Sequence, residues 1–474
     1  MAQSIRTTSG RQFDTLRDRL DHQQGLPFLA HLSRARVEAA CRERSHTWRE
    51  RIYTPWITLG IFLSQVLADD HSCDDAVDRF QKFRYDRGLP AVSPDTASYC
   101  EARSRLPEGV FWDLVRETGR AIHRHAKASW LFRGRPVKVV DGSTVSMPDT
   151  PENQAAYPQA KTQKPGIGFP IARILVVFSL AVGAVLEAAV GPYQGKQTGE
   201  LALLRSVIER FRPGDILLGD RSFCSYWVIA ASLARGADVV VRLHQCRSAD
   251  FRRGRRLGRD DHLVIWAKPE QVPDWMARAD YDAMPARITI RELRVRVTDK
   301  TKRVRSLVIV TTLLDARAYP AGELGGLFRR RWGAELDLRS LKAEMRMDVL
   351  RAKGPEMVRK EIAAHLVAYN LIRGIMAEAA RVEQIEPRRL SFKGSLHTAR
   401  AFEEDHLYDP ARIEADLPRL LELVGQKRLS DRPDRYEPRA VKRRPKPHPL
   451  LTMPRKAAKR LIRRGIILYK KHKT

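Results

Sequence analysis

The sequence contains the stretch Phe328-Arg-Arg-Arg-Trp-Gly-Ala-Glu-Leu-Asp-Leu-Arg-Ser-Leu-Lys342. At about 3.6 residues per turn, its spacing predicts that Phe328, Arg331, Glu335 and Lys342 share a narrow arc of one helix face. A carboxylate beside two cations and an aromatic ring favours a face that meets a metal ion and a phosphate backbone. The alternative is an ordinary ion pair between Arg331 and Glu335, four residues apart on a surface helix.

The charge of the chain is strongly positive. Its 474 residues include 86 Lys and Arg against 56 Asp and Glu, a formal net charge of +30. Such a chain predicts a polyanionic partner, and nucleic acid is the commonest one. The tail from Lys427 to Thr474 carries 18 Lys and Arg against three acids, an excess of 15 that is half of the total. The tail therefore favours electrostatic contact with DNA, and the alternative is a disordered, solubilising end.

The remaining composition excludes several classes of protein. Five scattered cysteines form no CxxC pair, which argues against a disulfide framework or a zinc site. The N-terminus lacks the apolar run of a signal peptide. The most apolar segment, Ile174 to Leu186, is too short to span a bilayer and contains Gly183. These features predict a cytoplasmic protein without membrane contact, associated with the nucleoid.

The first 130 residues show helical patterns. Thr54-Pro55 and Ser72 are typical starts for helices over 56–68 and 73–85, and two more helices are expected over 95–106 and 108–127. The second and third of these could form a helix-turn-helix that presents Tyr99, Arg103 and Arg105 to a DNA groove. A plain helical bundle is the alternative.

From Pro136 onward the pattern changes to strands mixed with helices. Two short apolar runs, Val137–Val140 and Ile216–Gly219, end in Asp141 and Asp220. Further strands are expected over 173–181, 185–190 and 239–243, with helices over 198–211 and 223–234. Three strands, a helix, a strand, a helix and a strand predict a mixed sheet with helices packed on it.

The segment between Leu243 and Thr311 is β-rich and basic, which predicts a β-domain inserted into the sheet domain. Its Arg291, Arg294 and Arg296 would suit a phosphate backbone, although solvated edge charges give the same pattern. A long amphipathic helix over 358–382 is expected to pack on the sheet. A connecting segment over 387–402 and a helix over 414–424 should follow it.

The acids suggest a metal site. Asp141 and Asp220 each end a buried run, where an unpaired carboxylate is costly. Two such acids converging with Glu335 would offer the oxygen ligands that hard divalent cations prefer. Two ions held in this way clamp the attacking and leaving oxygens of a phosphoryl transfer. Each acid taken alone could equally be a strand-end or turn residue.

These motifs together resemble a bacterial insertion-sequence family, the Y-R-E-K (IS-four) family of DDE transposases, which is marked by a Tyr-x2-Arg-x3-Glu-x6-Lys helix. Asp141-Gly-Ser-Thr is similar to the first acid motif of that family, and Gly219-Asp220-Arg221-Ser-Phe223 to the second. Arg331-x3-Glu335-x6-Lys342 matches the third in its full spacing. Ser391-Phe-Lys-Gly is similar to a segment further downstream. The resemblance covers roughly residues 50 to 410.

The resemblance implies an α/β fold, with an RNase H-like mixed sheet flanked by helices, a β-rich insertion and an N-terminal all-helical domain. The expected N-terminal DNA-binding domain covers residues 1–130, and the catalytic domain covers 131–243 and 306–383. The insertion covers 244–305, and a C-terminal helical segment with the basic tail covers 384–474. It implies cleavage at transposon inverted-repeat ends and strand transfer into target DNA, by a homodimer paired on two ends.

The same resemblance assigns roles to site residues. Asp141, Asp220 and Glu335 are expected to bind two Mg²⁺ ions, with Mn²⁺ able to substitute. Arg221, Phe328, Arg331 and Lys342 are expected to contact DNA. Phe328 stands where the family has Tyr, and loss of a hydroxyl that bonds a phosphate would cost on the order of 1 kcal/mol.

Two other functions fit the same pattern. One is a metal-dependent nuclease that cuts DNA without strand transfer. The other is a basic DNA-binding relative that has lost catalysis, for which Phe328 is the one hint in the sequence.

Overall fold

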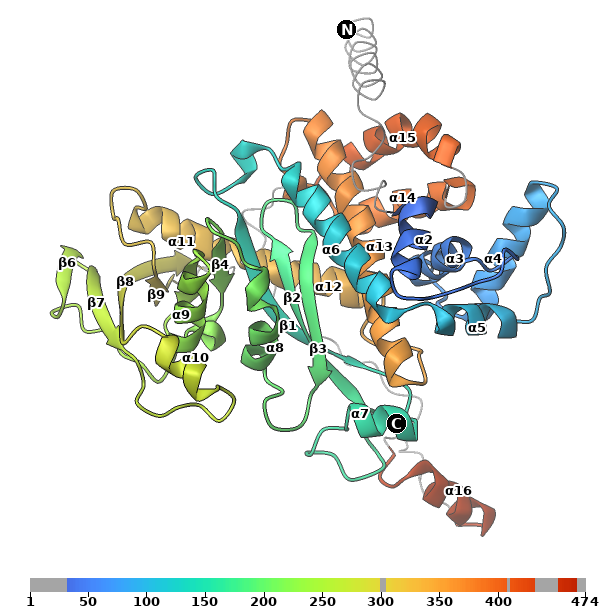
Figure 1. Ribbon diagram of the computed structural model, residues 1–474, viewed down its shortest axis with the longest axis horizontal. Coiled ribbons are helices and arrows are strands. Elements are labelled where there is room, and N and C mark those ends of the chain that lie inside the picture. The colour runs from blue at the N-terminus through green and yellow to red at the C-terminus, as the bar shows by residue number, and fades with distance from the viewer. Residues whose placement is uncertain (1–31, 299–303, 407–409, 431–450, 467–474) are drawn as a thin grey trace, which may run out of the picture.

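A computed structural model describes residues 32–298, 304–406, 410–430 and 451–466 (Figure 1). Within these residues, nine strands form one sheet in the order β3-β2-β1-β4-β5-β9-β8-β7-β6. The strands in chain order are β1 (Val137–Ser146), β2 (Ile171–Ser179), β3 (Val185–Pro192), β4 (Ile216–Gly219), β5 (Asp238–Arg242), β6 (Arg255–Gly258), β7 (Asp261–Ala267), β8 (Arg287–Thr298) and β9 (Val304–Thr311).

The sheet is mixed, as the sequence predicts. β1, β2 and β3 pair antiparallel, while β4 and β5 lie parallel to β1. The tight turn between β2 and β3 contains Gly183 at φ +75°, a conformation that glycine adopts without strain. The order β3-β2-β1-β4-β5 fits the RNase H-like arrangement that the resemblance implies. α7 (Pro151–Ala156) lies between β1 and β2.

Helices cover both faces of the sheet because consecutive strand residues point in opposite directions. Val139 lies in a core with α6 (Glu108–Arg124) and α13 (Pro355–Val382). Its neighbour Val140 lies in a second core with α8 (Glu200–Val207) and α9 (Tyr226–Ala234). The predicted packing of the long 358–382 helix is therefore confirmed, since α13 contacts β3.

The N-terminal region is helical and packs beside α13 (Figure 1). Thr54 and Ser72 accept hydrogen bonds from the backbone of their helices, as their positions predict. Helices of this region before α6 are α2 (Arg34–Arg42), α3 (Pro55–Leu67), α4 (Cys73–Asp86) and α5 (Ala97–Arg105).

The residues proposed to enter a DNA groove do not share one surface. Tyr99 is fully buried and its hydroxyl donates to Gln65 (2.8 Å), while the Arg103 guanidinium donates to the same side-chain oxygen (2.9 Å). Arg105 alone of the three is exposed. The helix-turn-helix role predicted for Tyr99 and Arg103 is therefore wrong, because their polar groups bind Gln65 inside the helical bundle.

The insertion is β-rich, as predicted, but its strands extend the main sheet. β9 pairs with β5, and β8, β7 and β6 follow outward, with α10 (Arg278–Ala283) beside them (Figure 1). Arg291 is fully buried and donates to Asp261 and to the carbonyl of Tyr319. The grouping of Arg291 with Arg294 and Arg296 is wrong, since residues at odd offsets in a strand face opposite sides.

The decisive stretch is helical but not one regular helix. α11 (Ala321–Arg330) ends before Arg331, α12 (Trp332–Arg339) begins after it, and a π-helical turn covers Ser340–Glu344. Arg331 keeps helical angles, φ −53° and ψ −33°, so the path continues through the break. Lys342 lies in the π turn, where the wider winding shifts it from the arc that ideal 3.6-residue spacing predicts.

The C-terminal part differs from the expectation at one segment. The predicted connecting segment over 387–402 contains the short 3₁₀ turn Pro387–Arg389 and most of α14 (Phe392–His406). The hydroxyl of Ser391 caps the first turn of α14 by accepting a hydrogen bond from Gly394 N–H (3.2 Å). α15 (Pro410–Gly425) contains the predicted 414–424 helix, and α16 (Arg455–Arg463) is amphipathic. Much of the basic tail lies outside the described residues. Across the described ranges, no helix is long and apolar enough to cross a bilayer.

Candidate active site

Asp141 and Asp220 stand at neighbouring positions of adjacent parallel strands. The pairing of β1 with β4 runs from Val137 and Ile216 to Val139 and Leu218. Each acid follows two residues after the last pair, so Asp141 and Asp220 stand at the same end of two neighbouring strands. Asp220 also accepts hydrogen bonds from Ser222, at 2.8 Å from the backbone N–H and 2.5 Å from the hydroxyl.

Glu335 reaches the same region from α12, which packs against β1. Arg331 joins it to the strand: its guanidinium donates to Glu335 Oε1 at 2.8 Å and lies 3.8 Å from Asp141 Oδ2. The side chain of Arg331 is 16% exposed, and its Nε is buried with no hydrogen-bond partner among the described residues. The pair is therefore more than a surface contact, since one cation bridges two of the three predicted acids.

A fourth acid, Glu200, completes the group from the other face of the sheet. It is the first residue of α8, and its carboxylate lies over Gly142 so closely that a Cβ there would be 2.4 Å from Glu200 Oε1. Burial raises the pKa of Glu200, and the nearby Asp220 carboxylate raises it further. Sequence reasoning missed Glu200, because an acid in the first turn of a helix is an ordinary stabilising choice.

The electrostatics of Asp141 favour the binding of a cation. Its side chain is 19% exposed. Burial raises the pKa of its carboxyl to about 6, and Glu335 and Glu200 add to the rise, whereas the Gly142 N–H and Arg331 oppose it. A carboxylate that is costly to ionise next to two other acids is typical of functional sites.

A buried network holds α12 in place. Asp337 is fully buried, two residues from Glu335, and accepts hydrogen bonds from Arg373 of α13 and from Arg388 (Nη2 to Oδ2, 2.8 Å). Arg373 also donates to the hydroxyl of Tyr369 (2.7 Å). Sequence reasoning missed this network, whose members lie 36 and 51 residues from Asp337.

The chain after α12 is fastened to the end of β1. The backbone N–H of Ser146 donates to the backbone carbonyl of Asp348 (3.0 Å), and the carbonyl of Ser146 accepts from the N–H of Leu350 (2.8 Å). The chain that follows Glu335 is thus fixed to β1, the strand that carries Asp141.

The residues predicted to contact DNA differ in their exposure. Arg221 is exposed directly beside Asp220, and Lys342 is half-buried in the π turn. Phe328 is 9% exposed and lies in the core, with the Arg331 guanidinium 5.9 Å from its ring centroid. The predicted DNA contact by Phe328 is therefore not supported, because a ring packed in the core offers little surface.

The donor set has the right chemistry for a hard divalent cation, since all four groups are carboxylates. In the described ranges, no three His, Cys, Asp or Glu side chains already form a cluster that could hold a metal ion. The Arg331 guanidinium lies between Asp141 and Glu335, where a cation would neutralise both. The carboxylates thus have the ligand chemistry of a divalent metal site, and the Arg331 guanidinium supplies the positive charge beside Asp141 and Glu335.

Comparison with known proteins defines the class. The family model described as "Transposase DDE domain" matches residues 132–371, which hold both strand acids and Glu335. The chain belongs to this family of DDE transposases.

Particular relatives narrow the family to its IS4 branch. Transposase InsG for insertion sequence element IS4 of Escherichia coli K12 is 30% identical over 382 residues, which cover 79% of this chain and 82% of that protein. The transposase for insertion sequence element IS421 of Escherichia coli is 27% identical over 34% of this chain and 51% of its own length. A structure of piggyBac transposase in a synaptic complex with hairpin DNA covers 82% of this chain and 81% of its own, at 12% identity and a TM-score of 0.38.

Proposed function

We propose that this DDE transposase cuts DNA at the ends of its insertion sequence and joins them to a target, with Asp141, Asp220 and Glu335 as its catalytic acids. The observation that carries the proposal is that Arg331 joins Asp141 of β1 to Glu335 of α12, while Asp220 stands at the matching position of the neighbouring parallel strand. The site lies in a chain of net charge +30, so a polyanionic substrate would be drawn to it.

Asp141, Asp220 and Glu335 would hold two Mg²⁺ ions, with Mn²⁺ as a substitute, and Glu200 is near enough to support Asp220. Bound divalent ions would supply charge stabilisation for the attacking and leaving oxygens of an in-line phosphoryl transfer. The acids would ligate the cation, Ser222 would orient Asp220, and the Asp337 network would keep Glu335 in position.

Arg221, Arg331 and Lys342 would contact DNA phosphates beside the acids. Arg221 is exposed at the edge of the site. Arg331, which now contacts Asp141 and Glu335, would bind a phosphate beside them, since a guanidinium binds a carboxylate or a phosphate in the same forked geometry. The ring of Phe328, 5.9 Å from the Arg331 guanidinium, would help to hold that side chain in place.

The family assignment further favours a homodimer that pairs two inverted-repeat ends and works on the nucleoid in the cytoplasm. The helical N-terminal region, the extended sheet of the insertion and the basic tail are proposed as DNA-binding parts. Exposed Arg294 and Arg296 of the insertion support this, as does the excess of cations after Lys427.

The test is a cleavage and joining assay on DNA that carries the inverted repeats flanking the gene. We expect Mg²⁺-dependent cleavage by the wild type, a loss of at least about a hundredfold in Asp141→Asn and Asp220→Asn, and unchanged end binding. Asp282→Asn, an exposed acid of α10, serves as the charge-matched control. Cleavage that survives in both variants would refute the site.

Precut ends separate transposition from plain nuclease action. A transposase joins the free 3′ end to a target duplex, whereas a nuclease leaves it free. A protein that binds ends but neither cuts nor joins them would be a catalytically impaired relative.

A further inference from the structure

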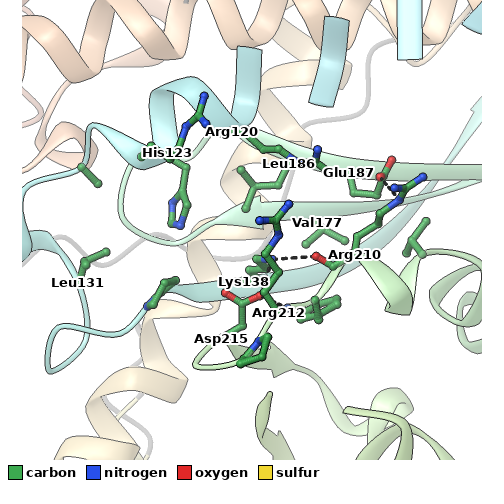
Figure 2. A pocket seen from close by; sticks show the side chains of 16 residues that line it. Arg120, His123, Leu131, Lys138, Val177, Leu186, Glu187, Arg210, Arg212 and Asp215 are labelled. Atoms are coloured by element: carbon green, nitrogen blue, oxygen red, sulfur yellow. Dashed lines mark hydrogen bonds and ion pairs between the residues drawn. The ribbon is translucent and has the colours of Figure 1, made fainter. Parts of the chain in front are cut away.

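A pocket of about 400 Å³ opens beside the starts of β1 and β4. It lies between the second half of α6 and the segment that leads into β4, and Figure 2 shows charged side chains gathered around it. Lys138, which lines the pocket, precedes Asp141 by three residues along β1, a separation of about 10 Å. The pocket is thus distinct from the acid site.

The cations in this pocket outnumber the acids. Five Lys and Arg side chains line it, against two acids, Glu187 and Asp215, which leaves a net charge of +3: Arg120, Arg124, Lys138, Arg210 and Arg212. Lys138 is paired with Asp215 at 2.6 Å, and Arg210 lies 3.4 Å from Glu187. Both acids are therefore already engaged.

Three arginines of the pocket remain uncompensated. Among the residues that the structure describes, Arg120, Arg124 and Arg212 show no carboxylate within ion-pair distance. Burial lowers the pKa of the Arg120 guanidinium; Glu187 opposes this, and Arg212 and Arg210 lower it further. Converging positive charges that repel one another in a concave site would be stabilised by an anion.

The arrangement of the arginines matches a phosphate chain. Arg120 and Arg124 stand four residues apart on α6, so they form a row with a step of about 6 Å, while Arg116 one turn before them is paired with Asp113 and Glu187. Neighbouring phosphates of one DNA strand have about this separation, and guanidiniums bind phosphates in a bidentate manner. Arg212 faces the row from the other wall of the pocket.

We propose that the pocket formed by Arg120, Arg124 and Arg212 is a second phosphate-binding site, which takes backbone phosphates of DNA away from the catalytic acids. The choice of DNA as the ligand rests on the proposed function, because a small phosphate compound would offer the arginines the same chemistry. In an enzyme that handles transposon ends and target DNA, this site would hold a DNA segment that is not being cut.

The test measures the salt dependence of DNA affinity by fluorescence anisotropy, with a 40-base-pair duplex between 50 and 200 mM KCl. Arg120→Gln/Arg124→Gln removes two exposed or half-buried cations without touching the buried Lys138–Asp215 pair. We expect about a fivefold or greater loss of affinity and a log–log slope smaller by about 1.8, because each lost phosphate contact contributes about 0.9. Arg235→Gln/Arg317→Gln, two exposed arginines outside the pocket and outside the insertion, is the control with the same charge change.

A second arm tests inorganic pyrophosphate as the ligand through its effect on melting temperature. A slope that falls in the pocket variant and not in the control supports the DNA site. An unchanged slope overturns the DNA assignment, and loss of pyrophosphate stabilisation in the same variant would then assign the pocket to a small phosphate. If neither changes, no phosphate site exists there. If the wild type binds no DNA at all, the proposed function fails instead.

Discussion

Replacing Asp141 by Asn should stabilise the metal-free protein while destroying its catalytic site. In the folded protein, burial raises the pKa of Asp141 to about 6 from an ordinary value of 3.8. Its ionised form is therefore costly when no divalent cation is bound. Asn has nearly the same shape and no charge, so the substitution removes this cost. Residues at functional sites commonly oppose stability in this way.

The expected magnitude depends on pH with a definite sign. Between pH 3.8 and 6 the folded protein holds more protons than the unfolded chain, so stability falls as pH rises through this window. The cost of Asp141 is about 1 kcal/mol at pH 4.5 and reaches about 3 kcal/mol at pH 7.5. The stabilising effect of Asp141→Asn should therefore grow by about 2 kcal/mol between these two pH values.

The assay compares the thermal unfolding of both proteins in EDTA and in Mg²⁺. The chain has several parts that could unfold separately, so the readout is the difference in melting temperature between the two proteins. Asp141→Asn should melt higher in EDTA at pH 7.5, and Mg²⁺ should raise the melting temperature of the wild type only. An equal effect at both pH values, or a variant that melts lower at pH 7.5, would refute the reasoning.

Asp337→Asn should destabilise the protein by about 3 kcal/mol, because the guanidiniums of Arg373 and Arg388 lose their buried carboxylate partner. The control Asp282→Asn, which breaks an exposed ion pair, should cost less than about 1 kcal/mol. Urea unfolding followed by fluorescence measures both free energies. Glu200→Gln should raise the metal-free melting temperature at pH 7.5, since Glu200 has a raised pKa beside Asp220, and should weaken the Mg²⁺-dependent rise. A lower metal-free value would contradict it. Phe328→Tyr should change the single-turnover cleavage rate little, because the ring is packed in the core, and a large increase in the rate would contradict this placement.

Local patterns predicted the elements that build the site. The two apolar runs that end in Asp141 and Asp220 predicted two strands, and both exist as β1 and β4. The prediction succeeds because strands buried on both faces consist of continuous apolar residues. The Arg331–Glu335 spacing also predicted a contact that exists. What the spacing could not supply was the 3.8 Å approach of Arg331 to Asp141, which depends on the packing of α12 on β1.

The errors came from contacts between distant parts of the chain. Arg291 reads as a surface cation, yet its partner Asp261 lies in the neighbouring strand and allows its burial. Tyr99 reads as a groove residue, yet Gln65 of another helix satisfies its hydroxyl. A single sequence does not reveal which polar groups find such partners, and burial of a polar residue depends on them.

The convergence of the three acids is tested most directly by replacing Mg²⁺ with Fe²⁺ and generating hydroxyl radicals with ascorbate and peroxide. Radicals formed at a bound ion cut the nearest backbone, and mass spectrometry of the fragments locates the cuts. The arrangement of the site predicts cuts close to Asp141, Asp220 and Glu335, three positions far apart in the sequence, all suppressed by excess Mg²⁺. Cuts confined to other segments, or cuts that Mg²⁺ does not suppress, would contradict a shared metal site.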